Sequence, residues 1–315
     1  MAGYIFNRVL ATIPVMAVVA LIVFFLLRLS PGDPAAIMAG DAASPAQIEQ
    51  MRHQMGLDRP IAVQFFVWIH QLLSGDFGLS LHSKIPVWDM IAGRIGPSLA
   101  LSISTISFSI LVAIPLGVIA AWAHGTLLDR AVMSFSVIGF SAPIFLTGYI
   151  LVFFFALKLD WFPVQGYHPV SDGASLFLRG LVLPTLALST IYIALISRIT
   201  RSSLLEILGE DFIRTARASG LAPRTVIFSY AFRNAVLPVI TTLGMVFSFL
   251  LGANVLVETV FAWPGIGLYA VNALITSDYA PVQGFVLTMA VLYVALNLLI
   301  DFLYGLVDPR VRLDS

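Results

Sequence analysis

Long apolar runs separated by shorter polar segments dominate the pattern of this chain. A helix needs roughly 20 mostly apolar residues to cross the hydrocarbon core of a bilayer. Runs of comparable length lie near residues 9–29, 98–122, 132–157, 181–199, 239–258 and 285–306. The pattern predicts an all-α, polytopic membrane protein with six transmembrane helices. Arg28 and Pro31 follow the first run without a small-residue cleavage site, so we interpret it as a retained span rather than a signal peptide.

The segment between the first two runs is too long for a simple turn. Ser44 followed by Gln47 is the pattern of a capped helix start. Ile61–Leu73 has the spacing of an amphipathic helix that lies at the membrane interface. The predicted organisation is therefore an inner tail with the first helix over 1–29, an extracytoplasmic segment with short amphipathic helices over 30–96, a core of five transmembrane helices over 97–307 and a cytoplasmic tail over 308–315.

Turn-forming residues interrupt the later apolar segments. Ser141-Ala142-Pro143 lies within the third run, where proline removes a backbone donor and predicts a kink. Pro264-Gly265 follows the fifth run and predicts a turn or re-entrant bend before the last span.

A charged segment over 201–237 is flanked by apolar runs of membrane length. An apolar stripe at helical spacing passes through Leu205, Leu208, Phe212 and Ala216. This stripe predicts one continuous helix over 205–216. Glu210 and Arg214 are placed to pair at i,i+4 on the same helix.

Glycine and proline then divide the charged segment. Gly220 predicts the end of the first helix, and Pro223 cannot extend it. A second helical run over 224–237 leads to Pro238 and the fifth span. The segment is thus predicted to be a helix–Gly–helix elbow at the membrane face, with charges available to a partner. The alternative is a solvated basic loop that merely satisfies the positive-inside rule.

Arginine placement predicts the orientation in the membrane. With the N-terminus inside, the cytoplasmic arginines are Arg8, Arg130, Arg198, Arg201, Arg214, Arg217, Arg224, Arg233, Arg310 and Arg312. The outer connection over 259–284 then contains neither lysine nor arginine. The positive-inside rule therefore predicts both termini inside.

Composition narrows the classes of function. Hydrophobic residues make up 59% of the chain, charged residues 11%, and the formal net charge is zero, which suggests no nucleic-acid partner. The absence of cysteine excludes disulfides and thiolate chemistry. All histidines fall outside the predicted spans, so neither a Ser-His pair nor a zinc site is predicted at depth, and an intramembrane enzyme is disfavoured.

The source of energy is also constrained. Ionisable residues fall near the ends of the predicted spans rather than in their middles, which argues against a proton relay. The only lysines, Lys84 and Lys158, follow serine and leucine, so there is no P-loop. If transport is driven by ATP, another polypeptide must hydrolyse it, and the elbow is where that energy would enter.

Several strings together resemble one transporter family. They are Pro31-Gly32-Asp33-Pro34, the stretch 211–220 with Arg233-Asn234 and Leu237-Pro238, the string from Glu258 to Gly267, and Asp278-Tyr279 with Gln283-Gly284. These strings resemble the B-type permease subunit of dipeptide, oligopeptide and nickel ABC importers. Where the broad ABC pattern begins Glu-Ala-Ala, this chain has Arg214-Thr215-Ala216, as does the peptide-importer branch.

The resemblance implies a type I ABC-importer permease fold and a transport subunit rather than an enzyme. Its implied partners are a second, C-type permease subunit, two ATPase subunits that carry ATP and Mg, and an extracytoplasmic solute-binding protein, in a bacterial inner membrane. No cofactor or metal is expected on this chain. The expected cargo is peptide, most simply a di- or oligopeptide; a gradient-driven carrier acting alone is the alternative.

Three sets of candidate site residues follow. The set expected to couple to the ATPase is Glu210, Asp211, Arg214, Thr215, Ala216, Arg217, Gly220 and Leu221. Candidates for lining the pathway are the small polar residues Ser102, Thr105, Ser109, Thr241, Gly244, Ser248 and Asn254, with helix packing as the alternative role of each. The outer motif comprises Glu258, Pro264, Gly265 and Gly267.

Overall fold

The computed structural model describes residues 2–29, 33–39 and 43–307. Pro31 and Gly32 of the first resembling string, and the predicted tail at 308–315, lie outside these described residues.

The regular elements of the described chain are all helices, apart from an isolated bridge between Leu79 and Pro86. The helices of the N-terminal part are α1 (Ala2–Leu29), α2 (Pro34–Ala39), α3 (Pro45–Gln54), α4 (Ile61–Leu73) and α5 (Val87–Trp122). They are followed by α6 (Leu127–Ser141), α7 (Ile144–Leu151), a π-helical stretch (Val152–Lys158), a 3-10 turn (Val170–Asp172) and α8 (Ala174–Leu208). The last elements are α9 (Asp211–Ala218), α10 (Pro223–Thr225), a second π-helical stretch (Val226–Ala231), α11 (Phe232–Val260), α12 (Ile266–Ile275) and α13 (Tyr279–Val307).

These helices confirm the predicted all-α, multi-span class. Among the described residues five helices are long and apolar enough to cross a membrane, or six if α6 and α7 count as one span. Both helices expected in the outer segment also form, and α3 begins with the predicted capping box. The Ser44 N–H donates to Gln47 Oε1 at 2.8 Å, while Ser44 Oγ accepts from the Gln47 N–H.

The predicted kink in the third span is a full break. Helices α6 and α7 meet at an angle of 105°. Ala142, which precedes Pro143, is extended with φ −75° and ψ 127°. Proline disfavours the α conformation at the residue before it, so the helix ends there rather than bending gently.

Two compact units make up the described chain. Unit 1 comprises residues 96–268 and 295–307, and unit 2 comprises Ala2–Ile95 and Tyr269–Val294. In unit 2, α1 packs against α4, with the Phe24 and Phe65 rings 5.1 Å apart. Its buried Asp278 accepts from Ser80 Oγ at 2.5 Å and from the Leu81 N–H at 2.9 Å.

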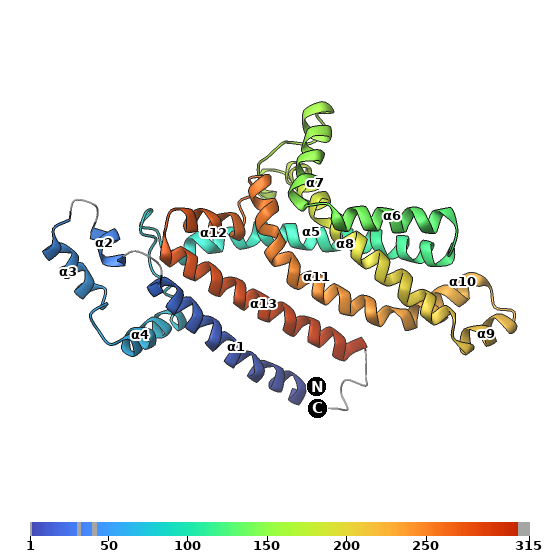
Figure 1. The fold of residues 1–315 in the computed structure, drawn as a ribbon, viewed down its shortest axis with the longest axis horizontal. Helices are drawn as coiled ribbons and strands as arrows, with labels where there is room; N and C mark the ends of the chain where they lie inside the picture. Colours follow the sequence, from blue (N-terminus) through green and yellow to red (C-terminus); the bar gives the residue numbers. More distant parts are fainter. Residues whose placement is uncertain (1, 30–32, 40–42, 308–315) are drawn as a thin grey trace. The chain divides into compact units, whose positions relative to one another are not determined.

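Helix α8 organises unit 1, where it packs against α6, α7 and α11 (Figure 1). Small and hydroxyl side chains allow this close packing. The hydroxyls of Ser136 and Ser197 are 3.0 Å apart, and those of Ser104 and Thr185 are 2.8 Å apart. The tightest approach is at Gly117 of α5, where a Cβ would lie 2.6 Å from Thr200 Cβ.

We predict that Gly117→Ala destabilises the protein. The added methyl would also lie 2.7 Å from the Ser197 carbonyl oxygen, and overpacking of this kind typically costs about 1–3 kcal/mol. Thermal unfolding of the purified chain should show a lower midpoint. Gly96→Ala is the control in the same helix, because nothing lies within 4 Å of its added Cβ. Equal midpoints for the two variants would contradict the close α5–α8 approach.

Candidate functional site

The first part of the charged elbow differs from the one continuous helix that the sequence predicted over 205–216. Helix α8 ends at Leu208, Gly209 forms its C-cap, and α9 starts afresh at Asp211. Glu210 has the extended backbone of an N-cap residue, so it does not pair with Arg214 as predicted. Arg214 instead contacts Asp211 at 3.2 Å, on the exposed surface. The elbow therefore contains a short separate helix rather than an extension of the preceding span.

Two side chains attach α9 to unit 1. Ile213 is fully buried and Ala216 is 7% exposed. They join an apolar cluster with Val118 and Ala121 of α5, Leu204 of α8, Val226 and Ala231 of the π-helical stretch, and Ala235 of α11. The helix thus packs against the π-helical stretch and shares one apolar cluster with residues near the ends of three long helices.

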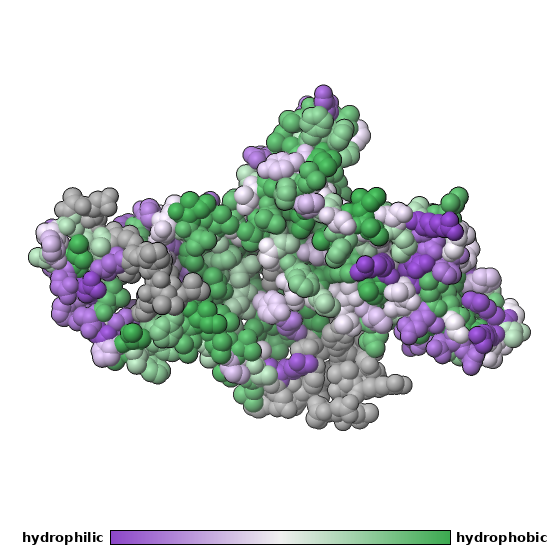
Figure 2. Space-filling model, in the orientation of Figure 1, coloured by the Kyte–Doolittle hydropathy of each residue, from purple (hydrophilic) through white to green (hydrophobic). Residues whose placement is uncertain are grey.

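The rest of α9 faces outward. Of the residues predicted to couple, Ala216 is buried, whereas Glu210, Asp211, Arg214, Thr215, Arg217, Gly220 and Leu221 are exposed. Phe212, which the predicted apolar stripe would have buried, is 43% exposed on this charged surface. Figure 2 shows hydrophilic residues gathered around α9 and α10. An exposed aromatic among charges is a typical anchor in protein interfaces.

Gly220 and the following residues close the elbow. Gly220 has φ +76°, the left-handed conformation that favours glycine, and its N–H donates to the Arg217 carbonyl at 3.0 Å. Pro223 then begins α10, which continues through the π-helical stretch into α11 without a break. The predicted second run therefore belongs to the fifth span, and Pro238 lies inside α11.

A partly buried ion pair near the elbow was missed from the sequence. Asp129 of α6, 3% exposed, accepts from Arg201 Nε at 2.6 Å and from Arg201 Nη2 at 2.8 Å. It also accepts from the Gly125 N–H at 3.0 Å. This bidentate contact fixes the start of α6 against α8. Because the partners are 72 positions apart, no local spacing could have indicated the pair.

The outer motif encloses a buried carboxylate. Glu258 is fully buried, and it accepts from Ser98 Oγ at 2.6 Å and from the Leu268 N–H at 2.9 Å. Ser98 Oγ in turn accepts from the Ile266 N–H at 2.8 Å. The loop after α11 is thus tied to the start of the membrane portion of α5.

The glycines of the motif are required by this close approach. A Cβ on Gly265 would overlap the Glu258 carboxylate, and one on Gly267 would lie 2.7 Å from Val255 Cγ2. Trp263, fully buried, donates from Nε1 to the Pro97 carbonyl at 2.9 Å. The Pro-Gly-Ile-Gly string therefore has a structural role, because its loop packs directly against the Glu258 carboxylate.

The candidate pathway residues lie on more than one face. Asn254 is buried and donates from Nδ2 to Ser102 Oγ at 2.7 Å, across the α5–α11 contact. Thr105 and Ser109 are fully buried, and their hydroxyls have no hydrogen-bond partner in the described part of the chain. On α11, Thr241 is exposed and Ser248 is half-buried, whereas Gly244 is buried. Asn254 therefore faces α5, as expected for helix packing, the alternative role stated for each candidate.

No group of three or more histidine or acidic residues is close enough to hold a metal within the residues described.

Comparison with known proteins identifies the family. The profile of the binding-protein-dependent transport system inner membrane component matches residues 113–313, and the profile of its N-terminal region matches residues 1–104. A probable peptide ABC transporter permease of Sinorhizobium fredii is 45% identical over 99% of this chain and 100% of its own length. The dipeptide transport system permease DppB of Escherichia coli K12 is 38% identical over 99% of both chains.

Solved structures agree on the fold. A chain of the MetNI methionine ABC transporter in an inward-facing conformation has a TM-score of 0.57 at 19% identity, covering 70% of this chain and 96% of that chain. The family profiles over residues 1–104 and 113–313 show that the protein belongs to the binding-protein-dependent transport system inner membrane components. It is a multi-pass permease subunit, and the resemblance inferred from its motifs is confirmed.

We predict that Glu258→Gln destabilises unit 1. Each carboxylate oxygen accepts from a different donor, so the amide –NH2 of glutamine would face one of them. An unpaired buried donor costs about 1–3 kcal/mol. Thermal unfolding should show the loss, with exposed Glu206→Gln as the control. A midpoint equal to that of the wild type would show that the hydrogen bonds of Glu258 do not stabilise unit 1.

The unpartnered hydroxyls of α5 give a second stability test. Thr105→Val and Ser109→Ala each remove a buried polar atom that has no partner among the described residues, so the unfolding midpoint should stay constant or rise. Ser102→Ala should lower it, because Asn254 Nδ2 loses its acceptor. A marked fall for Thr105→Val would show that its hydroxyl has a partner, such as water of the pathway.

Proposed function

We propose that this chain is one of two related permease subunits of an ATP-driven peptide importer. The curated relatives that match nearly the full length of the chain are named as peptide or dipeptide permeases. Their names support a peptide cargo, most simply a di- or oligopeptide. The comparisons give no support to a gradient-driven carrier.

The observation that carries the proposal is the construction of α9. Ile213 and Ala216 attach the helix to the ends of α5, α8 and α11, while Phe212 and its charged neighbours face outward. Such a helix can receive force from a partner and pass it directly to the membrane helices. Because the sequence has no P-loop, the partner would be an ATPase subunit that binds ATP and Mg.

The remaining assembly follows from the same proposal. A second, C-type permease would complete the pathway, two ATPases would bind inside, and an external solute-binding protein would deliver the peptide. The complex would lie in the cytoplasmic (inner) membrane with both termini of this chain inside. Within it, Thr241, Ser248 and their neighbours on α11 stay candidates for lining the path. Pathway residues of small and hydroxyl type would hold peptides weakly, as transport requires.

The central experiment is co-purification with the ATPase subunits. Phe212→Ala should reduce capture of the ATPase, because an interface anchor contributes about 2 kcal/mol or more. Phe66→Ala, which truncates a 69% exposed aromatic of α4, is the matched control and should capture normally. If Phe212→Ala captures the ATPase as well as the wild type does, with an unchanged unfolding midpoint, the proposal that α9 forms the interface is contradicted.

The orientation has an independent test. The natural chain has no cysteine, so single introduced cysteines report position cleanly. An impermeant maleimide should label exposed Ser171→Cys from outside the cell and exposed Ser219→Cys only after the inner face is opened. Labelling of Ser219→Cys in intact cells would overturn the predicted topology.

A further inference from the structure

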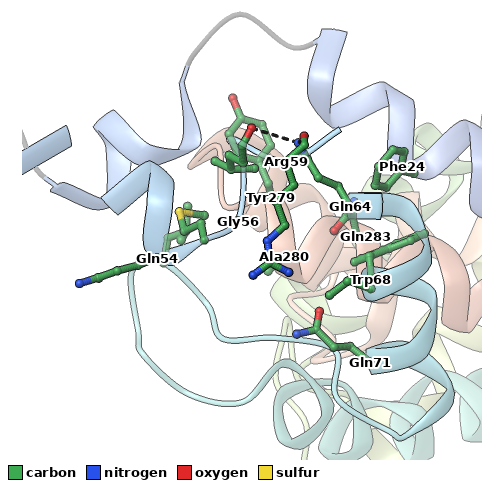
Figure 3. A pocket seen from close by; sticks show the side chains of 14 residues that line it. Phe24, Gln54, Gly56, Arg59, Gln64, Trp68, Gln71, Tyr279, Ala280 and Gln283 are labelled. Carbon is green, nitrogen blue, oxygen red and sulfur yellow. Dashed lines mark hydrogen bonds between the residues drawn. The ribbon is translucent and has the colours of Figure 1, made fainter. Parts of the chain in front are cut away.

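Unit 2 contains a cavity to which the proposed function above assigns no role. Its volume is about 430 Å³, within the range of small-molecule sites. It is lined by the connection between α3 and α4, by one side of α4 and by the start of α13 (Figure 3). On the predicted topology this cavity faces the extracytoplasmic side.

A rigid loop presents one cation to the cavity. Gln64 Nε2 donates to the carbonyl oxygens of Leu57 at 3.0 Å and Arg59 at 2.7 Å. Gly56 has φ +65°, and the Leu57 N–H donates to the Arg52 carbonyl at 3.0 Å. The backbone that carries Arg59 is therefore fixed before any ligand arrives.

The Arg59 guanidinium is available to an anion. Figure 3 shows its side chain reaching into the cavity. Within the described residues Arg59 forms no ion pair, and none of the lining residues is acidic. The adjacent Asp58 contacts His53 at 3.2 Å instead. An arginine in such a site prefers a carboxylate or phosphate, which it can hold with two parallel hydrogen bonds.

The other lining groups distinguish these anions. The amides of Gln71 and Gln283 make no hydrogen bond within the described chain, and each offers both a donor and an acceptor, as a peptide group requires. Trp68, Val67 and Phe24 supply an apolar wall. A carboxylate next to a peptide group and an apolar side chain is the C-terminal end of a peptide.

We propose that this cavity binds the C-terminal end of a short peptide, with its carboxylate on Arg59. The proposal rests on the proposed function and names the part of the substrate that this subunit recognises. Because none of the described residues that line the cavity is acidic, the peptide's N-terminal ammonium is not held by them and can point outward. C-terminally amidated peptides are therefore excluded, whereas N-acetylated peptides are accepted.

The experiment measures binding of radiolabelled Ala-Phe to the whole importer complex in phosphatidylcholine nanodiscs, without ATP or solute-binding protein. Saturable binding is expected, unchanged by N-acetylation and weakened about tenfold or more by C-terminal amidation, because the charged hydrogen bonds are lost. Arg59→Gln should weaken binding similarly. Lys84→Gln removes an exposed cation of the same segment that does not line the cavity, and it should bind normally.

Other results would overturn the proposal. Equal binding of acid and amide, or wild-type binding by Arg59→Gln, would show that the carboxylate is not held there. Arg59-dependent retention of phosphatidylglycerol without peptide binding would assign the cavity to a lipid headgroup. ATP-driven uptake of Ala-Phe, measured in parallel, separates the two claims. Uptake without Arg59-dependent binding overturns the cavity alone, whereas binding without uptake supports the cavity and contradicts the proposed function.

Discussion

The packing of Ile213 and Ala216 into one apolar cluster with residues near the ends of α5, α8 and α11 is the constraint on which the functional account depends. Without this packing, α9 would be connected to the membrane helices only through the chain, and a force on its exposed surface would not move them. Because Ile213 is buried in a close-packed cluster to which three long helices contribute side chains, the elbow is part of rigid unit 1. The Asp129–Arg201 pair fixes α6 against α8 beside the same cluster. Movement of α9 would therefore move several spans together.

A second set of polar contacts closes the other end of unit 1. Glu258, Ser98 and the loop from Trp263 to Leu268 form one connected network of hydrogen bonds. The glycines at 265 and 267 allow the loop to lie directly on the carboxylate. Between the two ends, α8 packs through small and hydroxyl side chains, so its neighbours approach closely. Unit 1 is thus held at both ends by specific contacts and along its length by close packing.

Much of the fold could be predicted because its signals are local. Long apolar runs predict spans, Ser44 and Gln47 predict a capped helix, and Pro143 marks a break. The elbow was only partly predictable, because the helical spacing of apolar residues continues across Gly209 although helix α8 ends at Leu208. The environment of Glu258 could not be derived by spacing, because Ser98 lies 160 positions away. The exposure of Phe212 and the burial of Ile213 could not be predicted either, because they depend on which face of α9 packs against the rest of unit 1.

The central claim is that α9 transmits ATPase closure through its buried anchors. The most direct measurement is ATP hydrolysis and peptide uptake, recorded together in proteoliposomes, for Ile213→Ala. The outward surface that we propose meets the ATPase is intact in this variant, while the attachment to unit 1 loses about 2–5 kcal/mol. The account predicts retained hydrolysis with uptake largely lost, so that more ATP is consumed per peptide. An unchanged ratio of hydrolysis to uptake would contradict it.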